Sequence, residues 1–274
     1  MSGSSLDKID TLPPLPYVTH EILLAVNDGT ADLRGIAAIL SKEPGLTARI
    51  VAMANSAFFA SQRPVYSVED AVVRLGLNRV RVLSASILLA KYFDARRCSP
   101  FHTERYWYDA VGTAFCAARL SRFLSINESG DAAYLAGLLH NIGLLLLVYV
   151  FPLEMANILA RRENDPDQAL SALERQFIGT DHHEAGRLLL SEWGLPAEIA
   201  LVAGHSHEAR YVGPHADLIE VVRFARVWTN VFFTEQPESP LADRLAPEAL
   251  SAIGEACRRE HDQLQAFARL LTHS

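Results

Sequence analysis

The sequence predicts an all-α protein. Apolar residues recur at spacings of three and four along almost the whole chain, which is the pattern of amphipathic helices. Strict alternation of apolar and polar residues, which is typical of half-buried strands, is hard to find over five or more positions. Glycine, proline and helix-capping side chains also separate the periodic segments, so the punctuation agrees with the periodicity.

The first unit of the chain, residues 12–95, contains five expected helices. The segment "LPPLPYV" precedes the first, Asp32 caps the second, and "EPG" at residues 43–45 ends that second helix. Ser67 and Asp70 have the spacing of a capping box before the fourth. The expected helices cover residues 19–27, 32–42, 46–59, 67–76 and 78–93.

A second helical unit, residues 102–233, follows the polar segment "DARRCSPF", in which Pro100 marks the boundary. Its expected helices cover residues 104–124, 132–150, 153–162, 168–177, 182–193, 196–207 and 216–233. After the surface loop "TEQPESPLADRLAP" we expect a C-terminal helical extension, residues 247–271. It divides into helices at 248–259 and 261–271, whose polar faces indicate packing on the outside of the bundle, and an apolar face on the last helix could support a homodimer.

Composition narrows the range of functions. The chain has 274 residues, of which 50% are hydrophobic, so it can bury one large core or two smaller ones. Its formal net charge of -7 and its alternating basic and acidic residues leave no extended positive face for nucleic acid. The cysteines are far apart and form no C-x-x-C pair, and the first residues lack the features of a signal peptide. We therefore expect a cytoplasmic protein with reduced thiols.

The run "YLAGLLHNIGLLLLVYVFPL", residues 134–153, contains no charged residue. A membrane-spanning helix needs roughly 20 apolar residues, so this run is long enough. However, His140 and Asn141 lie side by side within it, and hydrocarbon would leave both without partners at a cost of a few kcal/mol. The sequence therefore predicts a buried helix and no membrane span.

Histidines gather in the second unit. His182, His183, His205 and His207 are four of the ten histidines, and His140 precedes them in the uncharged run. Neutral imidazole is the commonest ligand of transition metals, so the cluster suggests a metal site, although carboxylates are missing from it. In the alternative interpretation, the first pair lies in the first turn of a helix beside a capping aspartate, and the second pair ends another helix.

Several motifs in succession resemble one protein family. The first unit carries "LPPLP", "IAAILSKEPGLTARIVAMANSAFF" and "VYSVEDAVVRLGLNRVRVL", and the second carries "AGLLHNIG", "GTDHHEAGRLLLSEWGLP" and "GHSHE". Over residues 12–233 the chain is similar to the HDOD family, the HD-related output domains of bacterial signalling proteins. The resemblance implies an N-terminal helical bundle packed on a bundle similar to the HD-type metal phosphohydrolases.

The same resemblance relates individual residues to the metal ligands of those hydrolases. Where the first metal-binding histidine is expected, "YWYDAV" has Asp109, and the family's His-Asp pair corresponds to His140 and Asn141. An amide has thus replaced the carboxylate, and asparagine is a poor ligand for such an ion.

The later ligand positions depart from the hydrolase pattern as well. His182 and His205 match the additional histidines of two-metal enzymes, whereas Ser206 replaces the second histidine of the last pair. The closing aspartate corresponds to Arg226, whose guanidinium would repel a divalent cation. The resemblance therefore implies a degenerate site, with no catalytic residue, no cofactor and no metal.

Two alternatives to an empty, degenerate site stay open. A single ion could be held by the set Asp109, His140, His182 and His205. Otherwise His140 and Asn141 are core polar groups, satisfied by neighbours such as Asp109, His182 or Arg226.

We accordingly expect a non-catalytic regulatory module in bacterial signal transduction, which acts through contacts with protein partners. Family members often follow a receiver domain, so the chain could be the output part of a response regulator in a two-component system. The alternative function is a metal-dependent phosphohydrolase of the HD superfamily, acting on a nucleotide or a cyclic dinucleotide.

Overall fold

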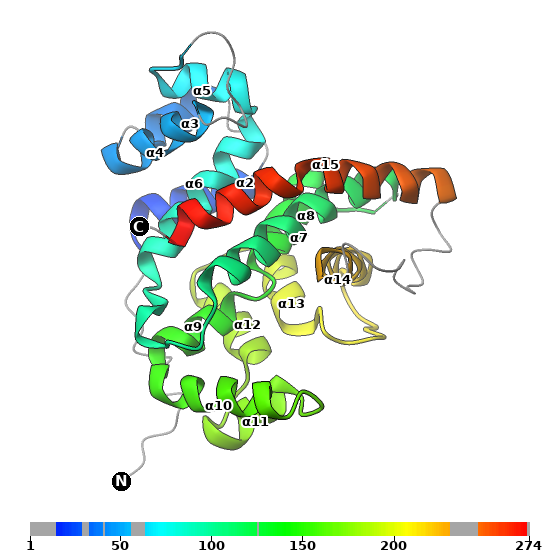
Figure 1. The fold of residues 1–274 in the computed structure, drawn as a ribbon. Coiled ribbons are helices and arrows are strands. Elements are labelled where there is room, and N and C mark those ends of the chain that lie inside the picture. Colours follow the sequence, from blue (N-terminus) through cyan, green and yellow to red (C-terminus); the bar gives the residue numbers. More distant parts are fainter. Residues whose placement is uncertain are drawn as a thin grey trace. The chain divides into compact units, whose positions relative to one another are not determined.

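The computed structural model describes residues 15–28, 33–40, 42–55, 64–124, 126–230 and 246–272. Every regular element within these ranges is a helix, which confirms the all-α prediction (Figure 1). The chain divides into two compact units, one comprising Leu15–Tyr92 and the other Phe93–Thr272.

The first unit contains α2 (Tyr17–Asp28), α3 (Leu33–Leu40), α4 (Pro44–Ala54), α5 (Val68–Leu75) and α6 (Leu77–Tyr92). The predicted cap of α5 is confirmed, because the Ser67 side chain accepts a hydrogen bond from the backbone N–H of Asp70 at 3.0 Å. The helix α4 begins at Pro44, two residues earlier than expected, since proline at the first helical position loses no backbone hydrogen bond. The expected end of this helix, residues 56–59, lies outside the described residues.

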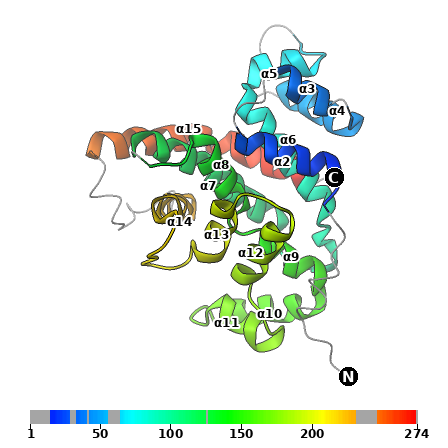
Figure 2. The same ribbon diagram turned by 180° about the vertical axis from the view of Figure 1, so that it is seen from behind.

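The second unit begins with the short helix η1 (Ala95–Arg97) and continues with α7 (Thr103–Phe123), α8 (Gly130–Leu139), α9 (Ile142–Val150), α10 (Pro152–Asn164), α11 (Leu170–Phe177), α12 (His182–Glu192), α13 (Ala197–His205), α14 (Ala216–Asn230) and α15 (Pro247–Thr272). The helix α7 is central, because α8, α14 and α15 all pack against it (Figure 1). On the other side of the unit, α12 packs against α9 and α13 (Figure 2).

The uncharged run forms two helices, so the expected single helix over 132–150 is wrong. The backbone leaves the helical conformation at Asn141, with φ -120° and ψ 21°, and α9 starts at the next residue. Asparagine is a favoured residue at such a start, but its side chain makes no capping hydrogen bond here, and nothing else in the run predicts the break. Within the described residues one apolar stretch, Gly130–Val150, is long enough to cross a membrane, and 78% of its most apolar window is buried inside the protein.

The C-terminal extension also differs from expectation. Instead of two helices, α15 is continuous, because the expected junction near residue 260 contains neither glycine nor proline. The middle of α15 is tied to α7 by a hydrogen bond of 2.6 Å between the Tyr108 hydroxyl and His261 Nδ1. Leu264, Phe267 and Leu271 of α15 are buried, and the expected homodimer stays a prediction.

Close helix crossings depend on glycines in the second unit. A Cβ on Gly143 of α9 would overlap the carbonyl oxygen of His182 and come within 2.5 Å of the Gly186 backbone nitrogen in α12. Similarly, a Cβ on Gly137 of α8 would lie 2.6 Å from the Cα of Ala114 in α7. The glycines therefore allow α9 to approach α12, and α8 to approach α7, at backbone contact distance.

We expect Gly143→Ala to destabilise the second unit by about 3 kcal/mol or more, because the new methyl group meets backbone that cannot rotate away. Chemical unfolding followed by circular dichroism measures this change. Gly130→Ala is the matched control, since its Cβ would meet only Ser121 Oγ at 3.5 Å and a carbonyl oxygen at 3.8 Å. Equal stability of the two variants would show that α9 and α12 are not fixed by this crossing.

Candidate functional site

His140 lies at the break between α8 and α9, and its side chain is 5% exposed. Its Nδ1 lies 2.7 Å from the carbonyl oxygen of Gly137, so the ring donates from Nδ1 and keeps Nε2 as an acceptor. Burial and, to a smaller extent, the positive charge of Arg226 lower the pKa of His140 from 6.5 to about 3. The ring is therefore neutral at physiological pH.

Asp181 caps α12, as one interpretation of the histidine cluster predicted. One oxygen of its carboxylate accepts the backbone N–H groups of His183 and Glu184, both at 2.9 Å, and the other pairs with Arg175. The capping carboxylate and its ion pair are thus fully used in holding the start of this helix.

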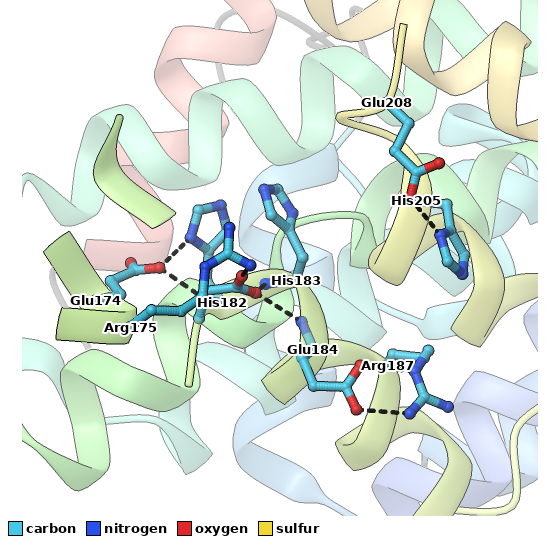
Figure 3. A network of polar contacts seen from close by, with 9 residues as sticks. Glu174, Arg175, His182, His183, Glu184, Arg187, His205 and Glu208 are labelled. Atoms are coloured by element: carbon cyan, nitrogen blue, oxygen red, sulfur yellow. Dashed lines mark hydrogen bonds and ion pairs between the residues drawn. The ribbon is translucent and has the colours of Figure 1, made fainter. Parts of the chain in front are cut away.

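A second carboxylate, which the sequence analysis missed, holds His182. Glu174 of α11 is fully buried, and its Oε2 accepts the backbone N–H of His182 at 2.9 Å and lies 2.5 Å from His182 Nδ1 (Figure 3). A carboxylate on one ring nitrogen fixes the orientation of the imidazole and leaves Nε2 for other contacts. Glu174 belongs to none of the recognised motifs, so the sequence carries no signal for this pair.

The next histidine, His183, stacks on two other imidazoles. Its ring centroid lies 3.9 Å from that of His182 and 3.6 Å from that of His207, and the rings of the latter pair are nearly parallel at 13°. Burial lowers the pKa of His183 to about 2, with His182, His207 and Arg226 as further causes, and burial also lowers the pKa of His207. His183 and His207 therefore stack in their neutral forms.

His205 is directed away from the other predicted ligands. Its Nδ1 lies 2.7 Å from Glu208, and its ring packs on that of Tyr211 at a centroid distance of 4.7 Å. Figure 3 shows His205 and Glu208 at a distance from the contact between His182 and Glu174. The helix α13 ends at His205, so His207 lies beyond the helix in which it was expected.

Arg226 reaches most of the cluster from α14. It is half-buried, and burial lowers the pKa of its guanidinium, while Asp109 opposes that shift. Its charge acts on the pKa values of residues from several elements, which are Asp109, His140, His183 and His207. Burial nevertheless raises the pKa of Asp109 to about 6, against the opposing charges of Arg105 and Arg226. A permanent cation thus lies near two of the predicted metal ligands, Asp109 and His140.

The residues present do not fit a metal ion. In the part of the chain that the structure describes, no group of three or more histidine, cysteine, aspartate or glutamate side chains could hold one. The predicted single-ion set of Asp109, His140, His182 and His205 is therefore not assembled. The pairing of His205 with Glu208 accounts for one missing ligand, and the charge of Arg226 would oppose any ion beside His140.

The neutral histidines predict acid sensitivity. The unfolded chain protonates them near pH 6.5, whereas the folded protein keeps His140 neutral down to about pH 3 and His183 down to about pH 2. The free energy of unfolding should therefore fall as the pH drops below 6.5, by up to about 1.4 kcal/mol per pH unit for each histidine. Asp109 has the opposite effect on the free energy of unfolding. Between its ordinary pKa and about 6 the folded state binds the proton more readily than the unfolded state, so the contribution of Asp109 to stability rises as the pH falls.

Urea unfolding at pH 6.5, 6.0, 5.5 and 5.0, all chosen to lie within that window, tests this expectation. The free energy of unfolding of the variant His140→Asn should change less steeply with pH than that of wild type, by up to about 1.4 kcal/mol per pH unit. An unchanged slope would mean that this ring takes up its proton in the folded protein.

Removing the carboxylate of Glu174 should be costly. We expect Glu174→Ala to destabilise the second unit by about 3 kcal/mol or more, because the backbone N–H and ring of His182 lose their common partner in the interior. The control is Glu184→Ala, which removes an exposed pair with Arg187 and should change stability by about 0.5 kcal/mol. Thermal unfolding of both variants gives the comparison, and similar losses would contradict the structural role of Glu174.

Comparisons with known proteins agree with this fold. A model of the HDOD domain family matches residues 12–209. A protein of Treponema pallidum (strain Nichols), which carries only the name "Uncharacterized protein", is 26% identical over 245 residues; the match covers 86% of this chain and 46% of that relative. This chain therefore spans about half the length of the relative.

Solved structures resemble the chain over nearly its whole length. A "putative signal transduction protein" of Marinobacter aquaeolei VT8 is 26% identical with a TM-score of 0.82, over 99% of this chain and 62% of that one. A "putative phosphohydrolase" of Shewanella amazonensis SB2B shares the fold at 23% identity and a TM-score of 0.74, over 98% of both chains. An HDOD domain protein of Geobacter sulfurreducens shares it at 22% identity and a TM-score of 0.72, over 97% and 95% of the two chains. The match of the family model over most of the sequence shows that this chain belongs to the HDOD family.

Proposed function

We propose that this chain is a non-hydrolytic regulatory module of bacterial signal transduction and that it acts through contacts with other proteins. Membership of the HDOD family and similarity to a protein named for signal transduction support the signalling part. The charges of the candidate site support the non-hydrolytic part.

The observation that carries the proposal is the place of Arg226. Its guanidinium acts electrostatically on Asp109, His140, His183 and His207, and the first two of these match positions at which an HD hydrolase would hold metal ions. A guanidinium has no lone pair to offer a metal, and in a partly buried site it strongly repels a divalent cation. A permanent protein cation therefore competes with the ions that hydrolysis needs.

The anionic side chains support the same conclusion. The His-Asp pair of the hydrolases has become His140 and Asn141, and an amide supplies no charge to offset a metal ion. Two other carboxylates of the region, Glu174 and Asp181, already bind His182 and the start of α12. Asp109 is then the carboxylate opposite Arg226, and a single anion cannot balance both a guanidinium and a metal centre.

A module of this kind passes on a signal through a partner. The Treponema relative extends well beyond the matched region, and so does the Marinobacter protein. We propose that further domains, such as a receiver, or separate proteins supply the signal to this chain. In that arrangement the module is the output part of a response regulator.

The proposal predicts no metal-dependent turnover. Purified protein is treated with chelator, divided, and reloaded with Mn²⁺, Fe²⁺ or Zn²⁺, and each sample is assayed with a phosphodiester and with a cyclic dinucleotide. We expect hydrolysis at the rate of the buffer blank and no stoichiometric metal by elemental analysis. Turnover that requires metal and disappears in His140→Ala would establish the phosphohydrolase alternative instead.

The protein-contact part needs a separate test. Affinity purification of the tagged chain from the source bacterium should enrich a protein relative to a tagged control, and deletion of the gene should alter a regulated output. If no protein is enriched and no output changes, the regulatory module is the wrong interpretation.

A further inference from the structure

The cluster around Arg226 contains buried polar groups that the protein leaves without partners. His183 Nδ1, Ser206 Oγ and Thr113 Oγ1 make no hydrogen bond, although their residues are only 7%, 1% and 0% exposed. Buried polar atoms are nearly always paired, because losing water without gaining a partner is costly. Three such atoms therefore indicate a partner that comes from outside the chain.

The three groups adjoin the residues that Arg226 reaches. His183 is itself one of them, and Ser206 directly precedes His207, whose ring stacks on that of His183 at 3.6 Å. Thr113 lies one helical turn after Asp109, on the same face of α7. The helix α14, which carries Arg226, packs against α7, which carries Thr113, and against α13, which ends just before Ser206.

The chemistry of this region favours an oxyanion over a cation. Both hydroxyl groups can donate, and neutral His183 can donate from Nδ1 without adding charge. Arg226 supplies the positive charge and a planar set of N–H donors that matches phosphate. Of the nearby carboxylates, Asp181 binds Arg175 and two backbone N–H groups, and Glu174 binds His182 through Oε2 while its Oε1 has no partner. Three unpaired donors and Arg226 thus outnumber one unpaired acceptor.

We infer that this cluster binds a small oxyanion, the phosphate group of inorganic phosphate or of a small organic phosphate, through Arg226, His183, Ser206 and Thr113 without a metal ion. The inference rests on the proposed function, because a hydrolytic metal centre would occupy the same region. Asp109 is the competing anion, and the incoming phosphate takes over part of its interaction with Arg226.

Isothermal titration of inorganic phosphate into the chelator-treated full chain tests the inference at low ionic strength. We expect saturable binding that Arg226→Gln weakens by about tenfold or more. Asp109→Asn should tighten binding by about threefold or more, because it removes the competing anion. A metal-bridged phosphate would respond in the opposite way to Asp109→Asn.

Arg223→Gln is the matched control, since Arg223 lies on the same helix and pairs with Glu220 instead. Its affinity should equal that of wild type. Circular dichroism checks that each variant is folded. If Arg226→Gln does not fold, two other variants test the inference. We then expect Ser206→Ala to bind phosphate more weakly than wild type and Asp109→Asn to bind it more tightly.

The inference is overturned if phosphate does not saturate the protein by about 10 mM, if Arg226→Gln binds as wild type does, or if Asp109→Asn abolishes binding. A parallel titration with a nucleoside monophosphate identifies the source of the phosphate, because tighter binding of the nucleotide would assign the site to an organic phosphate. Turnover is measured on the same samples with added metal. If the protein neither binds phosphate nor shows turnover, this inference alone is refuted. If it shows metal-dependent turnover, the proposed function is refuted.

Discussion

The backbone contact between α9 and α12 determines where the candidate site lies. Gly143 and Gly186 let the two helices touch near their N-terminal ends, so the break at His140 and Asn141 comes close to the start of α12 at His182. A side chain on Gly143 would collide with the carbonyl oxygen of His182 itself. The positions of the imidazole rings therefore depend on two glycines, which have no side-chain functional groups. The second glycine of "AGLLHNIG", Gly143, is needed for steric reasons and takes no part in the chemistry of a site.

Burial then determines the protonation of that site. Imidazoles that lie in the interior, near a guanidinium, stay neutral because protonation would add a charge without enough water or carboxylate around it. Glu174 and Asp181 are committed to the ring of His182 and to the start of α12, so removing either would leave its buried partners unpaired. The polar groups of this arrangement are held without a metal ion. A hydrolytic site would instead need surplus anionic oxygens that remain open to incoming ions.

Sequence reasoning recovered the helices better than the contacts of the site. Helix starts with a local cause, such as the caps at Ser67 and Asp181, were predicted, because the capping side chain lies within three residues of the group it binds. The break at Asn141 was missed because its side chain makes no capping hydrogen bond of the kind that a motif would indicate, and the continuity of α15 was missed although no glycine or proline interrupts it.

The site residues show the same limit. The sequence placed His205 among the predicted ligands, but a glutamate three residues later and Tyr211 hold its ring elsewhere. It gave no indication of Glu174, which is buried because α11 folds back toward the start of α12. Side-chain orientation of this kind depends on contacts between elements, and spacing along one chain does not encode it.

The link between α13 and α14 shows how such a site can be connected to the surface. His207 and Arg226 lie on either side of a segment whose last residue, His215, has a φ of 59°, a conformation that costs non-glycine residues about 1 kcal/mol or more. His215 Nδ1 lies 2.5 Å from Glu128, in the connection between α7 and α8, so this contact offsets the backbone strain. Because α14 starts at the next residue, the position of Arg226 depends on a strained turn held by the contact between His215 and Glu128.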